Sequence, residues 1–440
     1  CVLPQSQGRH GLVEQPPQSV FGCGKNGQSP VPLLRHALSV ARRRSRLGPL
    51  NPSRPTSLFA LSDTHERPRR SLVIAPQWVG DAIMSEPFVR ALQESGDEVT
   101  VAAMPWVAPV CEAFASAHAV ITLPLQRSGL QWSARWAVAK AWSDRFDAAW
   151  VLPNSFKSAL LPRWAGIAKR HGYQGESRWP LLNHRLPNPD RALRPPMVTH
   201  YLALAREFAG PGLPDWAKDT SDPKPELAQQ DPRSPQLSMP ADSVAKVWQE
   251  LGLGLGEALV MAPGAEYGPA KRWPVSHWAE VITRIDRPVV LLGSPKERAL
   301  CESITALLHE RVRARVHNLA GQTTLTQALA LVAGAHRVLS NDSGVMHMAA
   351  GLGVPQVAVF GSSSPLHTPP LNALARVIWL KGEDALHPPL DCAPCFAREC
   401  RYGHTRCLTE VTPQRVMQAL SEEFLSAQPI QWPEANEPQT

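Results

Sequence analysis

Apolar residues recur along the chain with two different spacings, beginning at residue 71. Short apolar runs bounded by Pro or Gly predict buried strands, and segments in which apolar residues recur every three or four positions predict amphipathic helices. In a first series we predict strands at 71–76, 98–104, 119–125 and 147–153, and helices at 82–93, 106–116, 132–145 and 155–166.

The same alternation begins again after a polar, Pro-rich interval that extends from about Pro187 to Pro240. This second series predicts strands at 257–264, 287–294, 336–342 and 355–361, and helices at 274–285, 295–310, 324–335 and 343–353. Strands that alternate with helices through short connections form parallel sheets with helices on both faces. The pattern therefore predicts an α/β protein with two doubly wound, Rossmann-like domains that face each other across a cleft.

Composition and charge add a third, different segment. The 440 residues are 43% hydrophobic and 19% charged, as is typical of a soluble globular protein, and no apolar run reaches the roughly 18 residues of a transmembrane segment. Residues 1–70 hold 11 Lys and Arg but only 3 Asp and Glu, a charge of +8, whereas the rest of the chain carries −1. Because the predicted domains are nearly neutral, we expect no nucleic-acid partner.

Residues 1–70 are predicted to be a disordered, basic leader, because they contain 9 prolines, the run ARRRSR and little periodicity. The first Met is Met84, so one interpretation of the leader is translated sequence upstream of a start near Ser71. An organelle transit peptide is the alternative.

The remaining boundaries follow from the two series and the linker between them. We expect a first domain at 71–238, a second at 239–412 with a Cys-rich loop at 391–407, a helix at 413–426 that crosses back to the first domain, and a disordered tail at 427–440.

Ligands of doubly wound sheets bind beyond the carboxyl ends of the strands, so the loops that follow the strands are candidate sites. In the first series, the loop PQWVGDAIM carries Asp81 where a helix begins. Asp is favoured at helix N-caps, but a carboxylate at this edge can also act as a general base toward a hydroxyl. The residues alone leave both interpretations open.

In the second series, the loop APGAEYGPAKRWP ends on Lys271 and Arg272. Basic pairs are commonly solvated surface residues, but at the carboxyl end of a strand this pair is suited to phosphate oxygens. Glu297 lies in the first turn of the next helix, where the helix dipole favours an acidic residue whatever its function. Binding of a ribose hydroxyl is the alternative for Glu297.

The segment SNDSGVMHMAAGLG places Asp342, Ser343 and Gly344 at a helix N-terminus. Free backbone N–H groups and the helix dipole attract phosphate there, Gly344 leaves room for a ligand, and His347 can donate to the same anion. An ordinary cap is the alternative, although a cap needs only one of these residues. The segment GLGLG at 252–256 precedes a strand rather than following one, and no G-x-G-x-x-G is present, which argues against dinucleotide binding.

These loops together place phosphate-binding groups on the second domain and a carboxylate on the first. The arrangement predicts that the second domain holds a donor linked to a nucleoside diphosphate while Asp81 activates another substrate. Group transfer fits this layout better than hydride transfer.

Cysteines and tryptophans supply two further expectations. Four cysteines with the spacing C-x2-C-x4-C-x6-C could ligate a structural zinc, or form disulfides in an oxidising compartment; they are Cys392, Cys395, Cys400 and Cys407. Three tryptophans at helical spacing are predicted to be core, namely Trp132, Trp136 and Trp278. Trp78 and Trp273 flank the loops of Asp81 and Lys271 and could line the cleft.

Six segments resemble glycosyltransferase family nine, the ADP-heptose:lipopolysaccharide heptosyltransferases. They are APQWVGDAIMSEP, VLPNSFKSALLP, APGAEYGPAKRWP, LLGSPKE, NLAGQTTLTQALAL and SNDSGVMHMAAGLGVPQVAVFGSSSPLHTPP, and they occur in the family's order between Ser71 and about Leu425. The resemblance implies a GT-B architecture, inversion at the anomeric carbon and no metal requirement for transfer.

The resemblance also assigns roles to residues. It implies that Asp81 is the catalytic base and that Lys271 contacts the diphosphate. The predicted donor-binding residues are Arg272, Glu297 at the ribose, Thr323 near the adenine edge, Asp342, Ser343, Gly344 and His347. The predicted acceptor-binding residues are Asn154, Ser155 and Lys157.

The activity that the resemblance implies is transfer of L-glycero-D-manno-heptose from ADP-heptose to the first heptose of the lipopolysaccharide inner core. The enzyme is then expected in the cytoplasm, peripheral to the inner membrane that carries its acceptor. Addition of the first heptose to Kdo is the nearest alternative. A nucleotide-sugar epimerase or dehydrogenase and a non-catalytic binding module are more distant ones.

Overall fold

The computed structural model describes residues 67–190, 194–221, 231–381 and 389–421. The described residues all belong to one compact unit. The predicted tail at 427–440 and nearly all of the predicted leader at 1–70 lie outside the described residues. None of the described helices is both long enough and apolar enough to span a bilayer.

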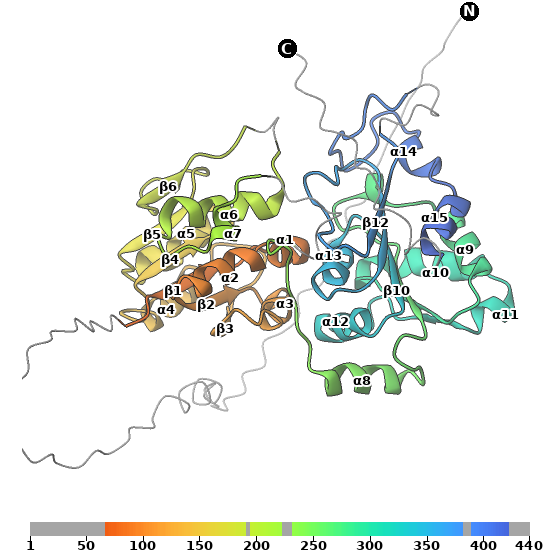
Figure 1. The fold of residues 1–440 in the computed structure, drawn as a ribbon, viewed down its shortest axis with the longest axis horizontal. Helices are drawn as coiled ribbons and strands as arrows, with labels where there is room; N and C mark the ends of the chain where they lie inside the picture. The colour runs from red at the N-terminus through yellow and green to blue at the C-terminus, as the bar shows by residue number, and fades with distance from the viewer. Residues whose placement is uncertain (1–66, 191–193, 222–230, 382–388, 422–440) are drawn as a thin grey trace, which may run out of the picture. The chain divides into compact units, whose positions relative to one another are not determined.

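The first half of the compact unit is built on a six-stranded parallel sheet with the order β3-β2-β1-β4-β5-β6 (Figure 1). Its strands are β1 Arg70–Ile74, β2 Glu98–Ala103, β3 Ala119–Thr122, β4 Ala148–Val151, β5 Lys169–Tyr173 and β6 His184–Leu186. The accompanying helices are α1 Val79–Met84, α2 Glu86–Glu94, α3 Ala108–Glu112, α4 Trp132–Ala141, α5 Phe156–Trp164, α6 Met197–Phe208 and α7 Asp215–Lys218.

The second half contains another six-stranded parallel sheet, with the order β12-β11-β10-β7-β8-β9. Its strands are β7 Leu259–Ala262, β8 Val289–Leu291, β9 Val316–Asn318, β10 Arg337–Asn341, β11 Gln356–Phe360 and β12 Ala375–Trp379. Its helices are α8 Ala241–Glu250, η3 Pro269–Lys271, α9 Val275–Arg284, η4 Pro295–Glu297, α10 Arg298–Ala306, α11 Glu310–Arg313, α12 Leu325–Ala333, α13 Gly344–Gly351, α14 Arg406–Thr409 and α15 Pro413–Leu420.

Both sheets have the Rossmann strand order. Counted within its own half, each sheet runs 3-2-1-4-5-6, so the direction of winding reverses beside the first strand. The switch points lie between β1 and β4 in the first sheet and between β7 and β10 in the second. The predicted α/β class with two doubly wound sheets is therefore confirmed, and the loops at both switch points are among those selected from the sequence.

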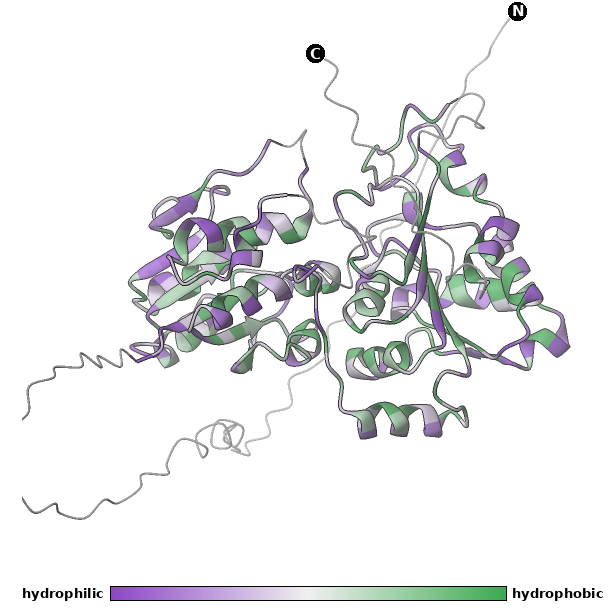
Figure 2. Cartoon of the chain, in the orientation of Figure 1, coloured by the Kyte–Doolittle hydropathy of each residue, from purple (hydrophilic) through white to green (hydrophobic). Residues whose placement is uncertain are grey.

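Hydrophobic packing joins the two halves. Helix α1 contacts α13, and α3 contacts α12. Ile83, Val110, Leu329 and Met348, one from each of these helices, belong to a single buried cluster. Figure 2 shows α13 mainly in hydrophobic colours, as expected for a helix that is buried on more than one side.

Several elements differ from the sequence prediction. The helix expected at 82–93 is two helices, because Pro87 lies in the first turn of α2 and the chain breaks at Ser85. Helix α6 forms inside the Pro-rich interval where no element was predicted. Strands β5, β6, β9 and β12 were also not predicted; two of them, β6 and β9, contain only three residues, too few to show a period of two.

The helix expected at 413–426 is found as α15, but its packing contradicts the prediction. It contacts α9 and β11, and its apolar residues Val416 and Leu420 are buried in a cluster of the second sheet. The predicted crossing to the first domain is therefore wrong for the described residues 413–421, because the apolar face of this helix is already covered by its own domain.

Candidate active site

Asp81 lies in the first turn of α1, just beyond the carboxyl end of β1. The N-cap of α1 is Trp78, and no side chain caps the helix, so the N-cap interpretation of Asp81 is wrong. Burial raises the pKa of Asp81 to about 6; the ammonium of Lys271 opposes this shift and the carboxylate of Asp342 adds to it. The structure thus brings the candidate base within electrostatic reach of two candidate donor-site residues.

Lys271 ends the short helix η3 in the loop that follows β7. Its Nζ donates to Oδ2 of Asp342 over 2.5 Å, and the hydroxyl of Ser363 donates to the same oxygen over 2.5 Å. Thr368 donates to the other carboxylate oxygen at 3.4 Å. Asp342 therefore holds the ammonium of Lys271 at the N-terminus of α13, where two loops of the second sheet meet.

The N-terminus of α13 has donors without protein acceptors. Ser343 is the N-cap, but its side chain makes no capping hydrogen bond, and its hydroxyl is buried without a partner among the described residues. The first backbone N–H groups of a helix also lack intrahelical acceptors. A buried hydroxyl and free N–H groups beside an ammonium fit an anionic group such as a phosphate.

Two glycines allow α1 and α13 to pack closely. A Cβ added to Gly80 would lie 2.7 Å from Cδ2 of His347, and one added to Gly344 would lie 3.1 Å from Cβ of Val79. The space at Gly344 is therefore used by Val79 of α1, and the approach of a ligand to Gly344 stays a prediction. Burial lowers the pKa of His347 to about 4, so this imidazole is neutral at pH 7 and packs against the helix of the candidate base.

Asn341 fixes the loop of residues 263–273 that carries Lys271, which we call the donor loop, and it was not selected from the sequence. This fully buried residue accepts a hydrogen bond from the N–H of Trp273 over 3.1 Å and donates to the carbonyl of Pro263 over 2.7 Å. Both ends of the Lys271 loop are thereby tied to the end of β10. A polar residue at the end of a buried strand was the available signal, as it was for Ser363 at the end of β11.

Glu297 serves as a helix cap and also faces the donor loop. Its Oε2 accepts hydrogen bonds from the N–H and hydroxyl of Ser294, at 2.8 and 2.9 Å, and the two residues form a capping box at the first turn of the helix. A Cβ added to Gly264 would lie 2.0 Å from Oε1 of Glu297. The second carboxylate oxygen therefore lies at the carboxyl end of β7, and its contact with a ribose hydroxyl stays a prediction.

The other two predicted donor residues are less closely tied to this cluster. The Nη2 of Arg272 donates to the carbonyl of Ala265 over 3.3 Å, while its Nε is buried without a described partner. Thr323 is partly exposed and immediately precedes Thr324, the N-cap of α12. Roles for Arg272 and Thr323 in donor binding stay predictions.

The predicted acceptor residues lie between the end of β4 and the first turn of α5. Asn154 donates to the side chain of Asn188 over 3.2 Å and accepts from Arg178 over 2.6 Å. Ser155 hydrogen bonds to the hydroxyl of Ser158. Lys157 donates to the carbonyl of Arg127 over 3.1 Å. The three residues therefore share the switch point of the first sheet, and their contact with acceptor stays a prediction.

Arg127 connects the acceptor side to the donor loop and was not found from the sequence. Its guanidinium lies 5.6 Å from the ring centroid of Trp78 and 5.1 Å from that of Trp106, and it pairs with Glu266 over 3.0 Å. Glu266 belongs to the loop that carries Lys271. The signal was its position in the loop after β3, at the same edge of the sheet as Asp81.

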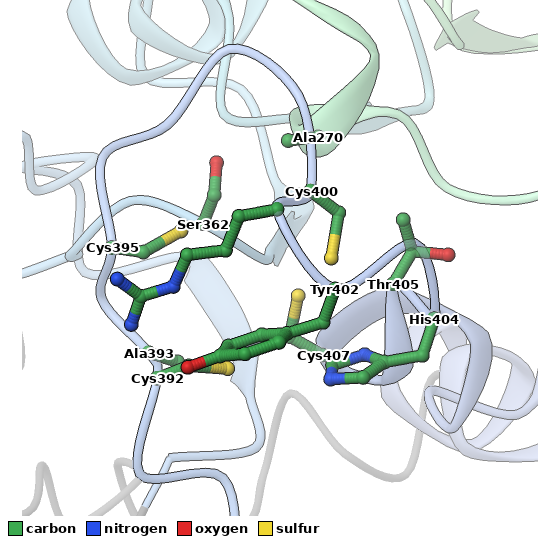
Figure 3. Close-up of a pocket in the computed structure, with 11 residues that line it drawn as sticks. Ala270, Ser362, Cys392, Ala393, Cys395, Cys400, Tyr402, His404, Thr405 and Cys407 are labelled. Carbon is green, nitrogen blue, oxygen red and sulfur yellow. The ribbon is translucent and has the colours of Figure 1, made fainter.

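The Cys-rich loop hydrogen bonds to the donor loop. The N–H of Ala270 donates to the carbonyl of Arg398 over 3.0 Å, and the hydroxyl of Tyr267 donates to the carbonyl of Phe396 over 2.9 Å. Figure 3 shows the four cysteines of this loop around one pocket, together with the stacked rings of Tyr402 and His404. The loop therefore has a structural role next to Lys271.

Structural zinc at these four cysteines stays a prediction. All four thiols are free, and no group of three or more His, Cys, Asp or Glu among the described residues is placed to hold a metal ion. Burial raises the pKa of Cys407 to about 12, and the other three cysteines add to this shift. Burial alone would also raise the pKa of Cys400, but hydrogen bonds from the backbone of residues 402–405 lower it below its usual value.

Some of the tryptophans predicted to be buried are exposed, and one of those predicted to line the cleft is buried. Trp278 is buried as expected, but Trp132 and Trp136 are 54% and 56% exposed, so their assignment to the core is wrong. Their helix α4 is covered on only one side. Trp273 is also fully buried and donates to the carbonyl of Val411 over 2.8 Å, so it does not line a cleft, whereas Trp78 is 46% exposed.

Comparison with known proteins gives a consistent result. Residues 135–405 match the family described as glycosyltransferase family 9 (heptosyltransferase). Lipopolysaccharide heptosyltransferase 2 of Escherichia coli K12 is 38% identical over 365 residues, which cover 80% of this chain and 97% of that protein. Lipooligosaccharide heptosyltransferase 2 of Haemophilus ducreyi is 36% identical over 368 residues, which cover 80% and 98%.

A solved structure agrees with these relatives. The structure of E. coli ADP-heptose lipopolysaccharide heptosyltransferase II is similar with a TM-score of 0.66 and 34% identity, and the similarity covers 81% of this chain and 98% of that one. The fold, the two switch-point sites and these similarities agree, and the chain belongs to glycosyltransferase family 9, the heptosyltransferases.

Proposed function

We propose that the protein transfers heptose from ADP-heptose to the first heptose of the lipopolysaccharide inner core. The observation that carries the proposal is the position of Asp81 within electrostatic reach of the Lys271–Asp342 pair. A base and an anion-binding helix terminus that meet in this way suit the transfer of a sugar away from a diphosphate. The heptosyltransferase 2 relatives support this acceptor.

In the proposed reaction, Asp81 accepts the proton of the acceptor hydroxyl. The oxygen then forms a bond to C1 of the donor heptose while the bond from C1 to the diphosphate breaks, with inversion at C1. Lys271, the hydroxyl of Ser343 and the N–H groups of α13 stabilise the negative charge that develops on ADP. Because the pKa of Asp81 is about 6, the group is mainly a carboxylate at pH 7 and still more basic than an ordinary Asp.

The proposed acceptor also suggests a location. Its donor is a nucleotide sugar and its acceptor is anchored in a lipid bilayer, so we place the enzyme in the cytoplasm, peripheral to the inner membrane. A structural zinc in the Cys-rich loop stays a separate prediction, which metal analysis of the purified chain tests.

Release of ADP from ADP-heptose tests the function. The purified chain is incubated with ADP-heptose and either a heptose-free, Kdo-terminated acceptor or a mono-heptosylated acceptor. We expect ADP release and acceptor extension only with the mono-heptosylated acceptor. Activity on the heptose-free acceptor would instead indicate addition of the first heptose, and donor binding without ADP release would indicate a binding module.

A further inference from the structure

Helices α4 and α5 place three tryptophans side by side, two of them exposed and the third, Trp164, half-buried. Trp132 and Trp136, on α4, are 54% and 56% exposed. Trp164, at the end of α5, lies beside both, with ring centroids 5.4 Å from Trp132 and 5.9 Å from Trp136. Clustered exposed aromatic residues of this kind mark interaction sites. We call these three residues the tryptophan patch.

The charged residues within the two helices of the tryptophan patch have a single sign. Helices α4 and α5 contain four basic residues and no acidic residue; the basic residues are Arg135, Lys140, Lys157 and Arg163. Lys140 and Arg163 are exposed, and neither forms an ion pair with an acidic side chain in the described part of the chain. A surface that combines exposed indoles with unpaired cations is complementary to an anionic bilayer interface, where Trp settles at the headgroup level and Lys and Arg attract acidic lipids.

The tryptophan patch adjoins the acceptor side. Lys157 lies in the first turn of α5 and Trp164 at its end, seven residues or about 10 Å further along the helix axis. Lys157 also hydrogen bonds to the loop that leads into α4. A bilayer in contact with the tryptophan patch would therefore bring a lipid-anchored acceptor close to the switch point of the first sheet.

We propose that the tryptophan patch docks the enzyme on an anionic phospholipid surface, with Lys140 and Arg163 contacting the headgroups. This inference rests on the proposed function for one point only. The proposed acceptor is anchored in a membrane, which gives the enzyme a reason to dock there. Docking would deliver the acceptor saccharide to the first domain.

Co-sedimentation of the full chain with vesicles tests the proposal. The wild type is expected to bind vesicles of phosphatidylethanolamine and phosphatidylglycerol, and to bind pure phosphatidylcholine much more weakly. The double variant Trp132→Ala/Trp136→Ala should bind the anionic vesicles at least about tenfold more weakly. Lys140→Glu/Arg163→Glu should lower binding by a similar factor, and added salt should weaken wild-type binding.

A matched control uses an exposed apolar residue elsewhere. Leu307, at the end of α10, is 59% exposed, and Leu307→Ala should leave vesicle binding unchanged. Wild-type vesicle binding by the tryptophan variant would overturn the proposal. The proposal would also fail if the wild type does not bind vesicles and instead forms a dimer that the same variant dissociates. The surface would then be a contact between copies of the chain.

Two acceptors separate this inference from the proposed function. Both double variants should retain wild-type turnover on a deacylated, mono-heptosylated acceptor in solution and lose turnover on the same saccharide carried by lipid in vesicles. If the wild type is inactive on both acceptors, the proposed function fails, while vesicle binding still decides the docking surface.

Discussion

Burial shifts the pKa values of Asp81 and His171 away from their usual ranges, but the two residues have different roles. The pKa of Asp81 rises to about 6 at the edge of the first sheet, where its carboxylate interacts electrostatically with Lys271 and Asp342. His171 lies in the core of the same half, stacked on Trp150 with ring centroids 4.2 Å apart and on Phe208 at 5.1 Å. The sequence indicated Asp81 through its position after a strand. It gave no signal for His171, whose burial depends on residues far away in the chain.

Both ring nitrogens of His171 are buried without a partner in the described structure, and burial lowers its pKa to about 3, with smaller contributions from His184, Arg69 and Lys169. His171→Phe keeps the aromatic stacking and removes two unpartnered polar atoms. We expect it to raise the free energy of unfolding at pH 7 by about 1–2 kcal/mol, measured by urea denaturation.

The pH dependence gives a second readout for the same variant. The unfolded state protonates His171 near its ordinary pKa of 6.5, but the folded state does so only near pH 3. The contribution of neutral His171 to stability is therefore complete above pH 6.5 and is lost as the pH falls toward 3. Between pH 7 and pH 5 the wild type should lose about 2 kcal/mol relative to His171→Phe. Parallel stability curves for the two proteins would contradict this account.

At the scale of elements, the contact between α1 and α13 sets the position of Asp81. Buried strands such as β1, β7 and β10 could be predicted from apolar runs, and α13 from its polar cap and small apolar residues. Helix α6 and the short strands β6 and β9 could not, because tertiary packing rather than local periodicity determines them. The crossing of α1 and α13 also had no sequence signal beyond Gly80 and Gly344.

Gly80→Ala tests this helix contact. The added Cβ would lie 2.7 Å from Cδ2 and 3.3 Å from Nε2 of His347, which is itself buried. We expect α1 to move away from α13, with a loss of about 1–3 kcal/mol in the free energy of unfolding and of at least about tenfold in turnover. The double variant Gly80→Ala/His347→Ala supplies the control, because it restores the space and should recover stability without activity. Wild-type stability and turnover of Gly80→Ala alone would refute the contact.

At the scale of the whole compact unit, two sheets with the same strand order bring four loops to two switch points. The repeated pattern of strands and helices was sufficient to predict the sheets and most of the residues at their carboxyl edges. Contacts that link the loops were not predictable. The pairing of Arg127 with Glu266 and the anchoring of the donor loop by Asn341 join residues 139 and 68 positions apart.

The central claim is that Asp81 removes the proton while the loop of Lys271 and the N-terminus of α13 hold the donor diphosphate. Turnover and ADP-heptose affinity of Asp81→Asn, measured beside Lys271→Ala, test this division most directly. We predict that Asp81→Asn lowers turnover by at least about 10²-fold with donor Kd within about twofold of wild type. The wild type should lose rate as the pH falls through about 6, and Asp81→Asn should not show this loss. Lys271→Ala should instead weaken donor binding as well as turnover. Normal turnover in Asp81→Asn, or an unchanged acidic limb of its pH profile, would contradict the account.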